Sequence, residues 1–199
     1  NGQTLTFCSG VPTWGICPVN CAAGATAVVE VTNPSTGKIW MDRNLGASQV
    51  ATSSTDVNSY GDLYQWGRRA DGHQCRTSAT TTTLSSSDQH PHGDFIRGSD
   101  WRSPQNTNLW QGVNGVNNPC PSGYRLPTET EIEAERLSWS SNTSAGAFGS
   151  SLKLPVAGIR FYNSGSLLYV GTEGFYWSST VSTTNSRSLY FNTSNAGMS

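Results

Sequence analysis

Residues 174–199 read GFYWSSTVSTTNSRSLYFNTSNAGMS. Its two aromatic runs, Phe175–Trp177 and Leu189–Phe191, are typical of paired strands, because aromatic side chains are enriched in β-structure. Small polar residues fill the ranges 183–186 and 192–195. The pattern predicts an aromatic strand pair that carries a small polar segment, with no further strand after residue 191.

Short strands are also predicted upstream of this pair. Valines at positions 28, 29 and 31 and the run Ile39–Met41 flank a turn at residues 33–37. Further candidates are Leu152–Ala157, Gly158–Phe161, Leu167–Val170, Phe175–Ser178 and Leu189–Phe191, with turns at 163–165 and 173–174 between several of them.

Two helices are predicted before those last strands. In residues 58–72 the apolar spacing of Tyr60, Leu63 and Tyr64 is helical, and Gly72 can end the helix. The second helix begins at LPTETEIEAERLSW, where Thr128 and Glu131 form a capping box. Ile132, Leu137 and Trp139 are expected on its buried side. Helices followed by short antiparallel strands predict an α+β domain.

The composition limits what the chain can do. Its 199 residues suffice for one domain, with or without an extension, and 7 Trp, 7 Tyr and 6 Phe supply a core. Only 13% of the residues are charged and the formal net charge is −1. This balance argues against nucleic-acid binding and against a polybasic membrane patch. No apolar run approaches the roughly 20 residues that a membrane span needs.

The cysteines indicate an oxidising compartment. They lie at positions 8, 17, 21, 75 and 120, and three of them fall within CSGVPTWGICPVNC. No second cluster follows at the spacing of a zinc site, so disulfides in an exported protein are the better interpretation, which leaves one cysteine over. Residues 1–27 are therefore predicted to be a cysteine-rich extension and residues 28–199 the domain. Because the chain begins with Asn1, we expect a processed product or a fragment.

Several polar and aromatic groups have a structural and a functional interpretation. Residues 73–118 are predicted to be an ordered loop pinned by Trp101 and Trp110. His73, His90 and His92 lie in it, and DQHPHGD alternates His with Asp, but we expect a solvated loop rather than a metal site. Glu129, Glu131, Glu133 and Glu135 are expected to serve the helix dipole and a solvated face. Trp40, Trp66, Trp101, Trp110 and Trp177 are expected in the core rather than on a sugar-stacking platform.

Five motifs in this order resemble the Fibrobacter succinogenes major paralogous domain, a member of the C-type-lectin-like fold superfamily. They are GKIWMDRNLGA, YGDLYQWGR, NPCPSGYRLPTETEIEAE, SLKLPVAGIR and GFYWSST followed by LYF. The resemblance covers roughly residues 28–195. It implies an exported or surface protein related to the variable ligand-binding proteins of diversity-generating retroelements, some of which are phage receptor-binding proteins on virions.

The resemblance also implies a binding face. The ranges 182–187 and 192–198 match the diversified segment of those variable proteins. Within them the predicted ligand-binding residues are Ser182, Thr183, Thr184, Asn185, Arg187, Tyr190, Asn192 and Asn195. Short polar groups and tyrosine suit adaptable recognition, because they hydrogen-bond in many geometries and add area at low entropic cost. The structural interpretation is a solvated hairpin that binds nothing.

One departure from the family concerns the end of the chain. The family closes with a strand that reads like SVRC, and the chain stops at Ser199 before it. That strand would bring a sixth cysteine, whose implied mate is Cys120. We therefore expect that Ser199 is not the natural terminus, and that the rest is disordered, removed or replaced by a strand of a neighbouring chain.

The sequence thus predicts an exported, non-enzymatic module at the cell surface or outside the cell. It is expected to bind a protein or glycan ligand through its polar C-terminal face, with no cofactor, metal, nucleic acid or membrane span. No calcium loop of the true C-type lectins is present, no cysteine follows Cys120, and no catalytic triad order or P-loop is evident. The alternative is a structural subunit of an extracellular filament that assembles by strand or arm exchange.

Overall fold

The computed structural model describes residues 5–8, 11–14 and 26–199. Its helices are α1 (Glu129–Leu137) and α2 (Ser144–Gly149), and a 3₁₀ turn, η1, covers Val57–Ser59. The strands are β1 (Leu5–Cys8), β2 (Val11–Trp14), β3 (Glu30–Thr32), β4 (Ile39–Met41), β5 (Thr80–Thr81), β6 (Phe95–Ile96), β7 (Ile159–Arg160), β8 (Leu167–Leu168), β9 (Gly174–Ser182), β10 (Asn185–Phe191) and β11 (Ala196–Met198). This is a mixed α/β fold with few helices and small, mostly antiparallel sheets, compatible with α+β.

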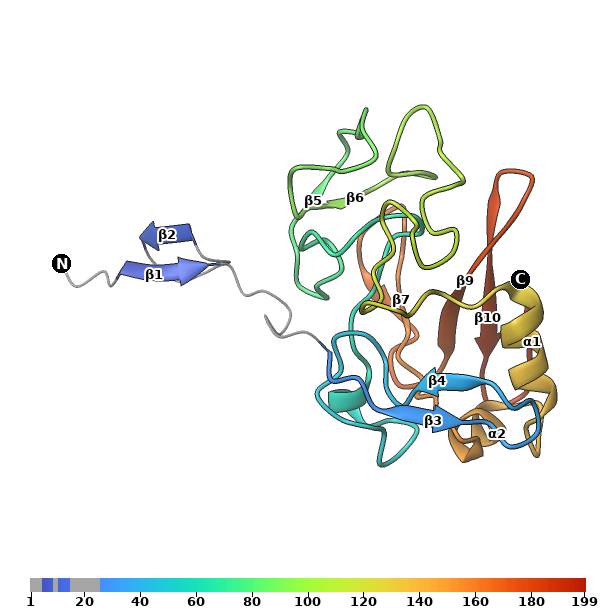
Figure 1. The fold of residues 1–199 in the computed structure, drawn as a ribbon. Helices are drawn as coiled ribbons and strands as arrows, with labels where there is room; N and C mark the ends of the chain where they lie inside the picture. Colours follow the sequence, from blue (N-terminus) through green and yellow to red (C-terminus); the bar gives the residue numbers. More distant parts are fainter. Residues whose placement is uncertain (1–4, 9–10, 15–25) are drawn as a thin grey trace.

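The long hairpin β9–β10 and the short strand β11 form one sheet in the order β11-β10-β9, with α1 beside it (Figure 1). The register places Tyr176 opposite Leu189 and Phe175 opposite Tyr190. Gly174 lies opposite Phe191, whose ring occupies the place that a side chain at position 174 would take. The aromatic runs therefore pair as the sequence predicts.

The main hydrophobic core lies between this sheet, α1 and the segment 147–156. Phe191 is at its centre, with its ring stacked on Tyr176 and edge-on to Trp139, each at a centroid distance of 5.6 Å. The buried members are Ile132, Trp139, Ala147, Leu152, Leu154, Val156, Leu189, Phe191 and Ala196. These side chains come from segments that are far apart in the sequence, so the core fixes the position of the hairpin.

Helix α1 begins as predicted. The Thr128 hydroxyl accepts from the Glu131 amide at 3.3 Å, and the Glu131 carboxylate accepts from the Thr128 amide at 2.9 Å. Ile132 and Trp139 are buried, as expected, whereas Leu137 is 68% exposed. The prediction for Leu137 is wrong because Ile132, Glu135 and Trp139 occupy the buried side, and the turn of the helix places Leu137 on another side.

The predicted helix at residues 58–72 is wrong. The segment contains only the end of η1, followed by turns and irregular structure. Gly61, Gly67 and Gly72 all adopt positive φ angles, between 66° and 112°, which interrupt a right-handed helix. The helical spacing of Tyr60, Leu63 and Tyr64 comes instead from an irregular chain that buries aromatic rings. Helix α2 was not predicted.

The strand predictions were right in part. The runs at Ile39–Met41, Leu167–Leu168 and within 175–191 are strands, whereas Leu152–Ala157 is irregular although it is largely buried. The expectation of no strand after Phe191 is wrong, because β11 pairs with β10 and Ser199 exchanges two main-chain hydrogen bonds with Ser188. The prediction that the chain lacks the family's closing strand concerns residues beyond Ser199 and stays a prediction.

The segment 73–118 forms an ordered set of turns in the upper part of the domain, beside the β9–β10 hairpin (Figure 1). It contains the short parallel pair β5–β6. Trp101 and Trp110 are 3% and 1% exposed, so they pin the segment as predicted. No helix among the described residues is long and apolar enough to cross a bilayer.

Of the predicted extension, residues 1–27, the structure describes little beyond the antiparallel pair β1–β2. The predicted cysteine staples of this extension fall outside the described residues. Cys120 is a free thiol and Cys75 is buried. The predicted boundary between residues 27 and 28 stays a prediction.

Candidate functional site

The tip of the β9–β10 hairpin holds four of the eight predicted binding residues. All four residues of the range 182–185 are exposed, and the chain reverses there through Thr183, which has a φ of 58°. The Thr183 hydroxyl bonds to the Ser182 carbonyl oxygen at 2.6 Å. The side chains of Ser182, Thr184 and Asn185 have no hydrogen-bond partner within the part of the chain that the structure describes. They are therefore available to a ligand.

Two tryptophans anchor the base of this hairpin to the loop before it. The Trp66 indole N–H donates to the Ser178 carbonyl oxygen at 2.9 Å, and the Trp177 indole N–H donates to the Tyr64 carbonyl oxygen at 2.8 Å. Trp66 and Trp177 are half-buried, so they support the hairpin rather than lie in the core as predicted. The tip is thus displayed on a fixed base.

A neighbouring loop reaches the tip through Gln105, which the sequence analysis missed. The Gln105 side-chain amide donates to the Thr184 carbonyl oxygen at 2.8 Å, and Gln105 is itself exposed. Gln111 of the same loop donates to the Ser179 carbonyl oxygen at 2.8 Å. No sequence pattern marks these glutamines, because their role depends on a loop that lies close only after folding.

Arg187 and Tyr190 do not belong to one site. Arg187 pairs with Glu129 at the start of α1, with its Nε and Nη2 at 2.9 and 2.8 Å from the same carboxylate oxygen. Tyr190 packs instead against Phe175, at a ring centroid distance of 6.1 Å, and donates to Asn195. Because Leu189 and Phe191 face the core with α1, Tyr190 faces the other side of the sheet.

Asn192 and Asn195 lie at the far end of β10 from the tip. Asn192 accepts from the amides of Ser194 and Asn195 at 2.8 and 3.0 Å, so its side chain holds the turn into β11. Strand β10 spans seven residues, and this length places the turn about 20 Å from the tip. The structure therefore brings the tip residues together and separates them from the turn residues.

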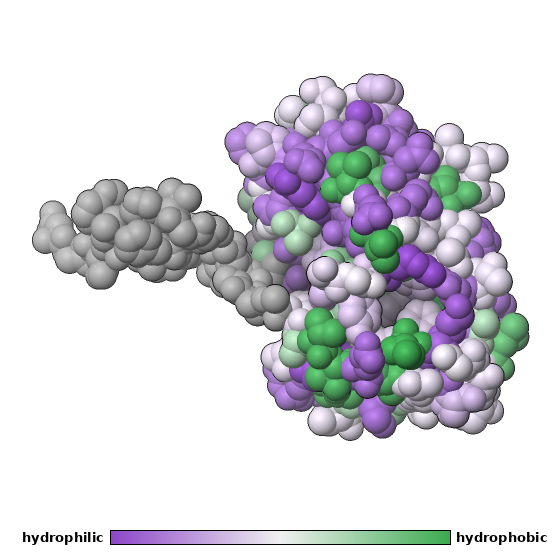
Figure 2. All heavy atoms as spheres, in the orientation of Figure 1, coloured by the Kyte–Doolittle hydropathy of each residue, from purple (hydrophilic) through white to green (hydrophobic). Residues whose placement is uncertain are grey.

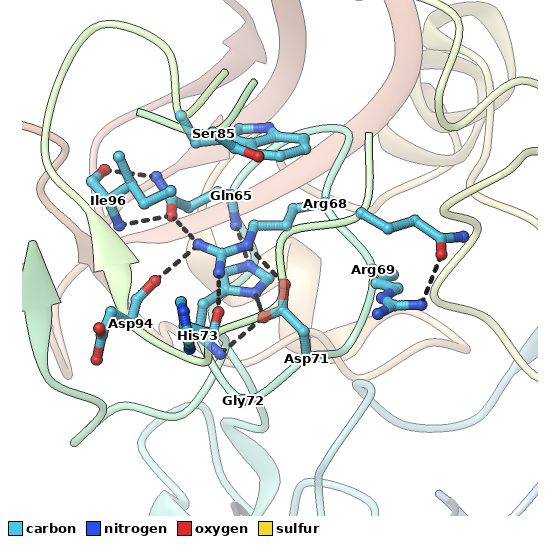
Figure 3. A network of polar contacts seen from close by, with 12 residues as sticks. Gln65, Arg68, Arg69, Asp71, Gly72, His73, Ser85, Asp94 and Ile96 are labelled. Atoms are coloured by element: carbon cyan, nitrogen blue, oxygen red, sulfur yellow. Dashed lines mark hydrogen bonds and ion pairs between the residues drawn. The ribbon is translucent and has the colours of Figure 1, made fainter. Parts of the chain in front are cut away.

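A buried polar network joins the segment 65–71 to the loop 73–118 (Figure 3). Arg68 is fully buried and its guanidinium donates to Asp71 at 2.8 Å. Its other donors bind Gln65 Oε1 at 2.9 Å, the Asp94 carbonyl oxygen at 2.8 Å and the His92 carbonyl oxygen at 2.7 Å. All of these groups are satisfied, so the network holds the loop in place and offers no open ligand site.

His73 belongs to the same network. The expectation that it lies in a solvated loop is wrong. It is fully buried, its Nδ1 lies 2.7 Å from Asp71, and its Nε2 accepts from the Gln65 amide at 3.0 Å. Burial lowers the pKa of His73 to about 4, although Asp71 opposes this shift. Because both ring nitrogens are engaged, this Asp–His pair has no free lone pair to act as a general base.

The other two histidines show no metal geometry. His90 is 9% exposed, so the solvated-loop interpretation is wrong for it, and its ring contacts His92 edge-on at a centroid distance of 5.6 Å. Among the described residues no group of three His, Cys, Asp or Glu side chains could hold a metal ion.

Glu135 departs from the solvated face that was expected for the acidic residues of α1. It is fully buried and accepts hydrogen bonds from Asn33 and from the Trp139 indole N–H. Asn33 also accepts from the amides of Ser35 and Thr36, so one side chain joins the β3–β4 turn to α1. Glu135 therefore has a structural role, as predicted. The role is to link α1 to the β3–β4 turn inside the protein, and not to carry a charge on the surface.

A cavity of about 740 Å³ lies between β4, the segment 119–127 and β9. Figure 2 shows that the domain is hollowed on this side, with apolar groups at the rim. Its walls are mostly apolar and aromatic, and include Trp40, Tyr64, Leu154, Phe161, Phe175 and Trp177. This volume falls in the range of ligand-binding sites. The sequence analysis did not predict the cavity, because its walls come from distant segments.

Two ionisable groups in the cavity wall are shifted by burial. Burial raises the pKa of Asp62 to about 6, although the nearby Arg76 guanidinium lowers it. Burial also raises the pKa of the Cys120 thiol to about 12. Cys120 therefore stays protonated at neutral pH and is a poor nucleophile.

No protein-family model, curated protein or solved structure matches this chain.

Proposed function

We propose that this chain is an exported, non-enzymatic C-type-lectin-like module that binds a protein or glycan at a cell or virion surface through the tip of its β9–β10 hairpin. The observation that carries the proposal is the exposed group of small polar side chains at residues 182–185 on a hairpin anchored by Trp66 and Trp177. Unpaired hydroxyl and amide groups on a fixed base suit recognition, because little ordering entropy is lost on binding.

The proposed site is narrower than the eight residues predicted from the sequence. It keeps Ser182, Thr183, Thr184 and Asn185 and adds the neighbouring Gln105. Arg187, Tyr190, Asn192 and Asn195 already have partners within the fold, so we assign them to positioning the hairpin and the β11 turn.

The test is binding of the purified chain to a glycan array and to intact bacterial and eukaryotic cells. The triple variant Ser182→Ala, Thr184→Ala, Asn185→Ala is compared with the double variant Thr193→Ala, Ser194→Ala. The control residues are also exposed and polar but lie at the opposite end of β10. We expect at least a tenfold loss of binding for the tip variant and none for the control. Equal binding by both variants, or no binding by the unaltered chain to any of these surfaces, would contradict the proposal.

A further inference from the structure

The outer edge of β9 is paired at one end and open at the other. Ser188 and Ser199 exchange two main-chain hydrogen bonds, so the main-chain groups of Ser188 point toward β11. Main-chain groups alternate along a strand, so those of the next residue, Leu189, point toward β9, where Leu189 lies opposite Tyr176. The main-chain groups of Tyr176 therefore point toward β10.

Along the regular part of β9 it follows that the N–H and C=O groups of Phe175 and Trp177 point away from β10. The register shifts between Trp177 and Val181, and in this irregular part the Ser179 amide donates to the Pro127 carbonyl oxygen at 2.8 Å while its carbonyl oxygen accepts from Gln111 at 2.8 Å. The equivalent groups of Phe175 and Trp177 have no partner within the described part of the chain. Unpaired main-chain groups that are half-buried are costly, and natural proteins cover such edges.

The open part of the edge faces the cavity. Phe175, Tyr176 and Trp177 all line it, and Leu126 and Pro127, which cover the edge at Ser179, line it too. The cavity is also lined by Trp40 of β4 and by Cys120, whose thiol is free. The cavity thus offers main-chain hydrogen-bonding groups along one side and apolar side-chain surfaces around them.

We propose that this cavity is a docking slot for an extended strand of a partner protein, which adds to the outer edge of β9 next to Phe175 and Trp177. The expected partner has apolar side chains at alternate positions, because one face of such a strand would meet the apolar walls while its main chain pairs with β9. A compact apolar ligand would fill the volume but would leave the main-chain groups unpaired. The slot is independent of the hairpin tip that we propose for ligand binding.

The probe is an acetylated and amidated hexapeptide of alternating valine and threonine. Two versions are compared, one N-methylated on every valine and the other on every threonine. N-methylation removes N–H donors from one edge of a strand only, and the two peptides keep the same side chains. We expect the two affinities for the full chain to differ at least tenfold, since only one version keeps the donors that face β9. We also expect the better peptide to slow hydrogen exchange of the Phe175 and Trp177 amides.

A second experiment tethers the peptide to the chain, in case the free peptide binds too weakly to be measured. The same six residues are joined after Ser199, which lines the cavity, through a Gly-Ser linker, because a tether raises the effective concentration to about the millimolar range. The control carries proline at two of the six positions. We expect protection of the two amides with the strand and not with the proline control.

Three results would overturn the proposal. The first is equal binding of both methylated peptides, and the second is unchanged exchange at Phe175 and Trp177 in the tethered chain. The third is self-association, seen by light scattering and reversed by the peptide, which would place a strand of a second copy in the slot and favour the filament alternative. Loss of binding at the hairpin tip would leave all of these measurements unchanged, so the two proposals fail separately.

Discussion

At the scale of single residues, the contribution of a charged group to the fold depends on whether it is buried and paired. The number of charged groups is less informative. The chain has few charges, yet Arg68, Glu135 and Asp71 are largely or fully buried and each is paired. Polar residues that the sequence suggests are exposed at the surface therefore hold distant segments together. Asp62 is different, because its side chain lines the cavity with no hydrogen-bond partner among the described residues.

Asp62 should make the chain less stable as the pH rises. The carboxyl has a pKa of about 6 in the folded state against an ordinary value of 3.8, so the folded state holds a proton that the unfolded state has already lost. The stabilising effect of this proton is complete below pH 3.8 and is lost as the pH rises through 6. We expect Asp62→Asn to gain about 1–2 kcal/mol over wild type at pH 7.5, after allowance for solvent screening.

The measurement is urea unfolding of both proteins at pH 4 and pH 7.5. The two free energies of unfolding should differ little at pH 4 and more at pH 7.5, with the variant above wild type. A constant difference across this range would contradict the assigned pKa shift.

At the scale of elements, the space around a residue in the sheet predicts the effect of a substitution on stability better than strand propensity does. A Cβ atom on Gly174 would lie 2.2 Å from the Phe191 ring, whereas one on Gly197 of β11 would meet nothing within 4 Å. Gly174→Ala should therefore lower the free energy of unfolding by about 1–3 kcal/mol, because the Phe191 ring is fixed by its neighbours in the core. Gly197→Ala in the same sheet is the matched control and should stay within about 0.5 kcal/mol of wild type. Equal effects of the two variants would show that the ring can move aside.

The N-terminal cap of α1 provides a second prediction at this scale. Thr128→Ala removes the acceptor for the Glu131 amide and should cost about 1 kcal/mol. Thr130→Ala, in the first turn of the same helix, changes an exposed side chain and is the control. Thermal unfolding of both variants tests this, and a Thr128→Ala midpoint no lower than that of Thr130→Ala would contradict the cap.

At the scale of the whole molecule, the buried network around Arg68 determines whether the upper loop region is ordered. Arg68 reaches the carbonyl groups of His92 and Asp94 from a segment about 25 residues earlier. The loop it holds also supplies Gln105 to the hairpin tip. Loop, network and tip are therefore mechanically connected.

Arg68→Lys should loosen this region as a unit. Lysine keeps the charge but cannot make the forked contacts of the guanidinium, so we expect a loss of about 3 kcal/mol and faster proteolysis within residues 73–118. Arg69→Lys is the control, because Arg69 makes a hydrogen bond with Gln89 at the surface. Proteolysis that is equally slow in both variants would show that the network does not hold the loop.

The parts of the fold that depend on residues close together in the chain can be predicted from the sequence. The capping box needs only Thr128 and Glu131 in sequence, and the β9–β10 pair is evident from two aromatic runs about a dozen residues apart. The sequence also located the exposed polar tip, because a hairpin turn between aromatic strands must face solvent.

The other features of the fold depend on contacts that form only when the chain is folded. Helical spacing at Tyr60, Leu63 and Tyr64 was misleading, because positive φ angles at the glycines of the same segment give an irregular chain. The Tyr64 carbonyl oxygen in this segment accepts from the distant Trp177 indole. The pairing of Arg187 with Glu129 and the buried link between Glu135 and Asn33 join residues that are 58 and 102 positions apart. The cavity beside the open edge of β9 is likewise lined by distant segments. Local pattern cannot show such contacts, because the free energy that fixes them comes from burial and pairing between segments that meet only in the folded chain.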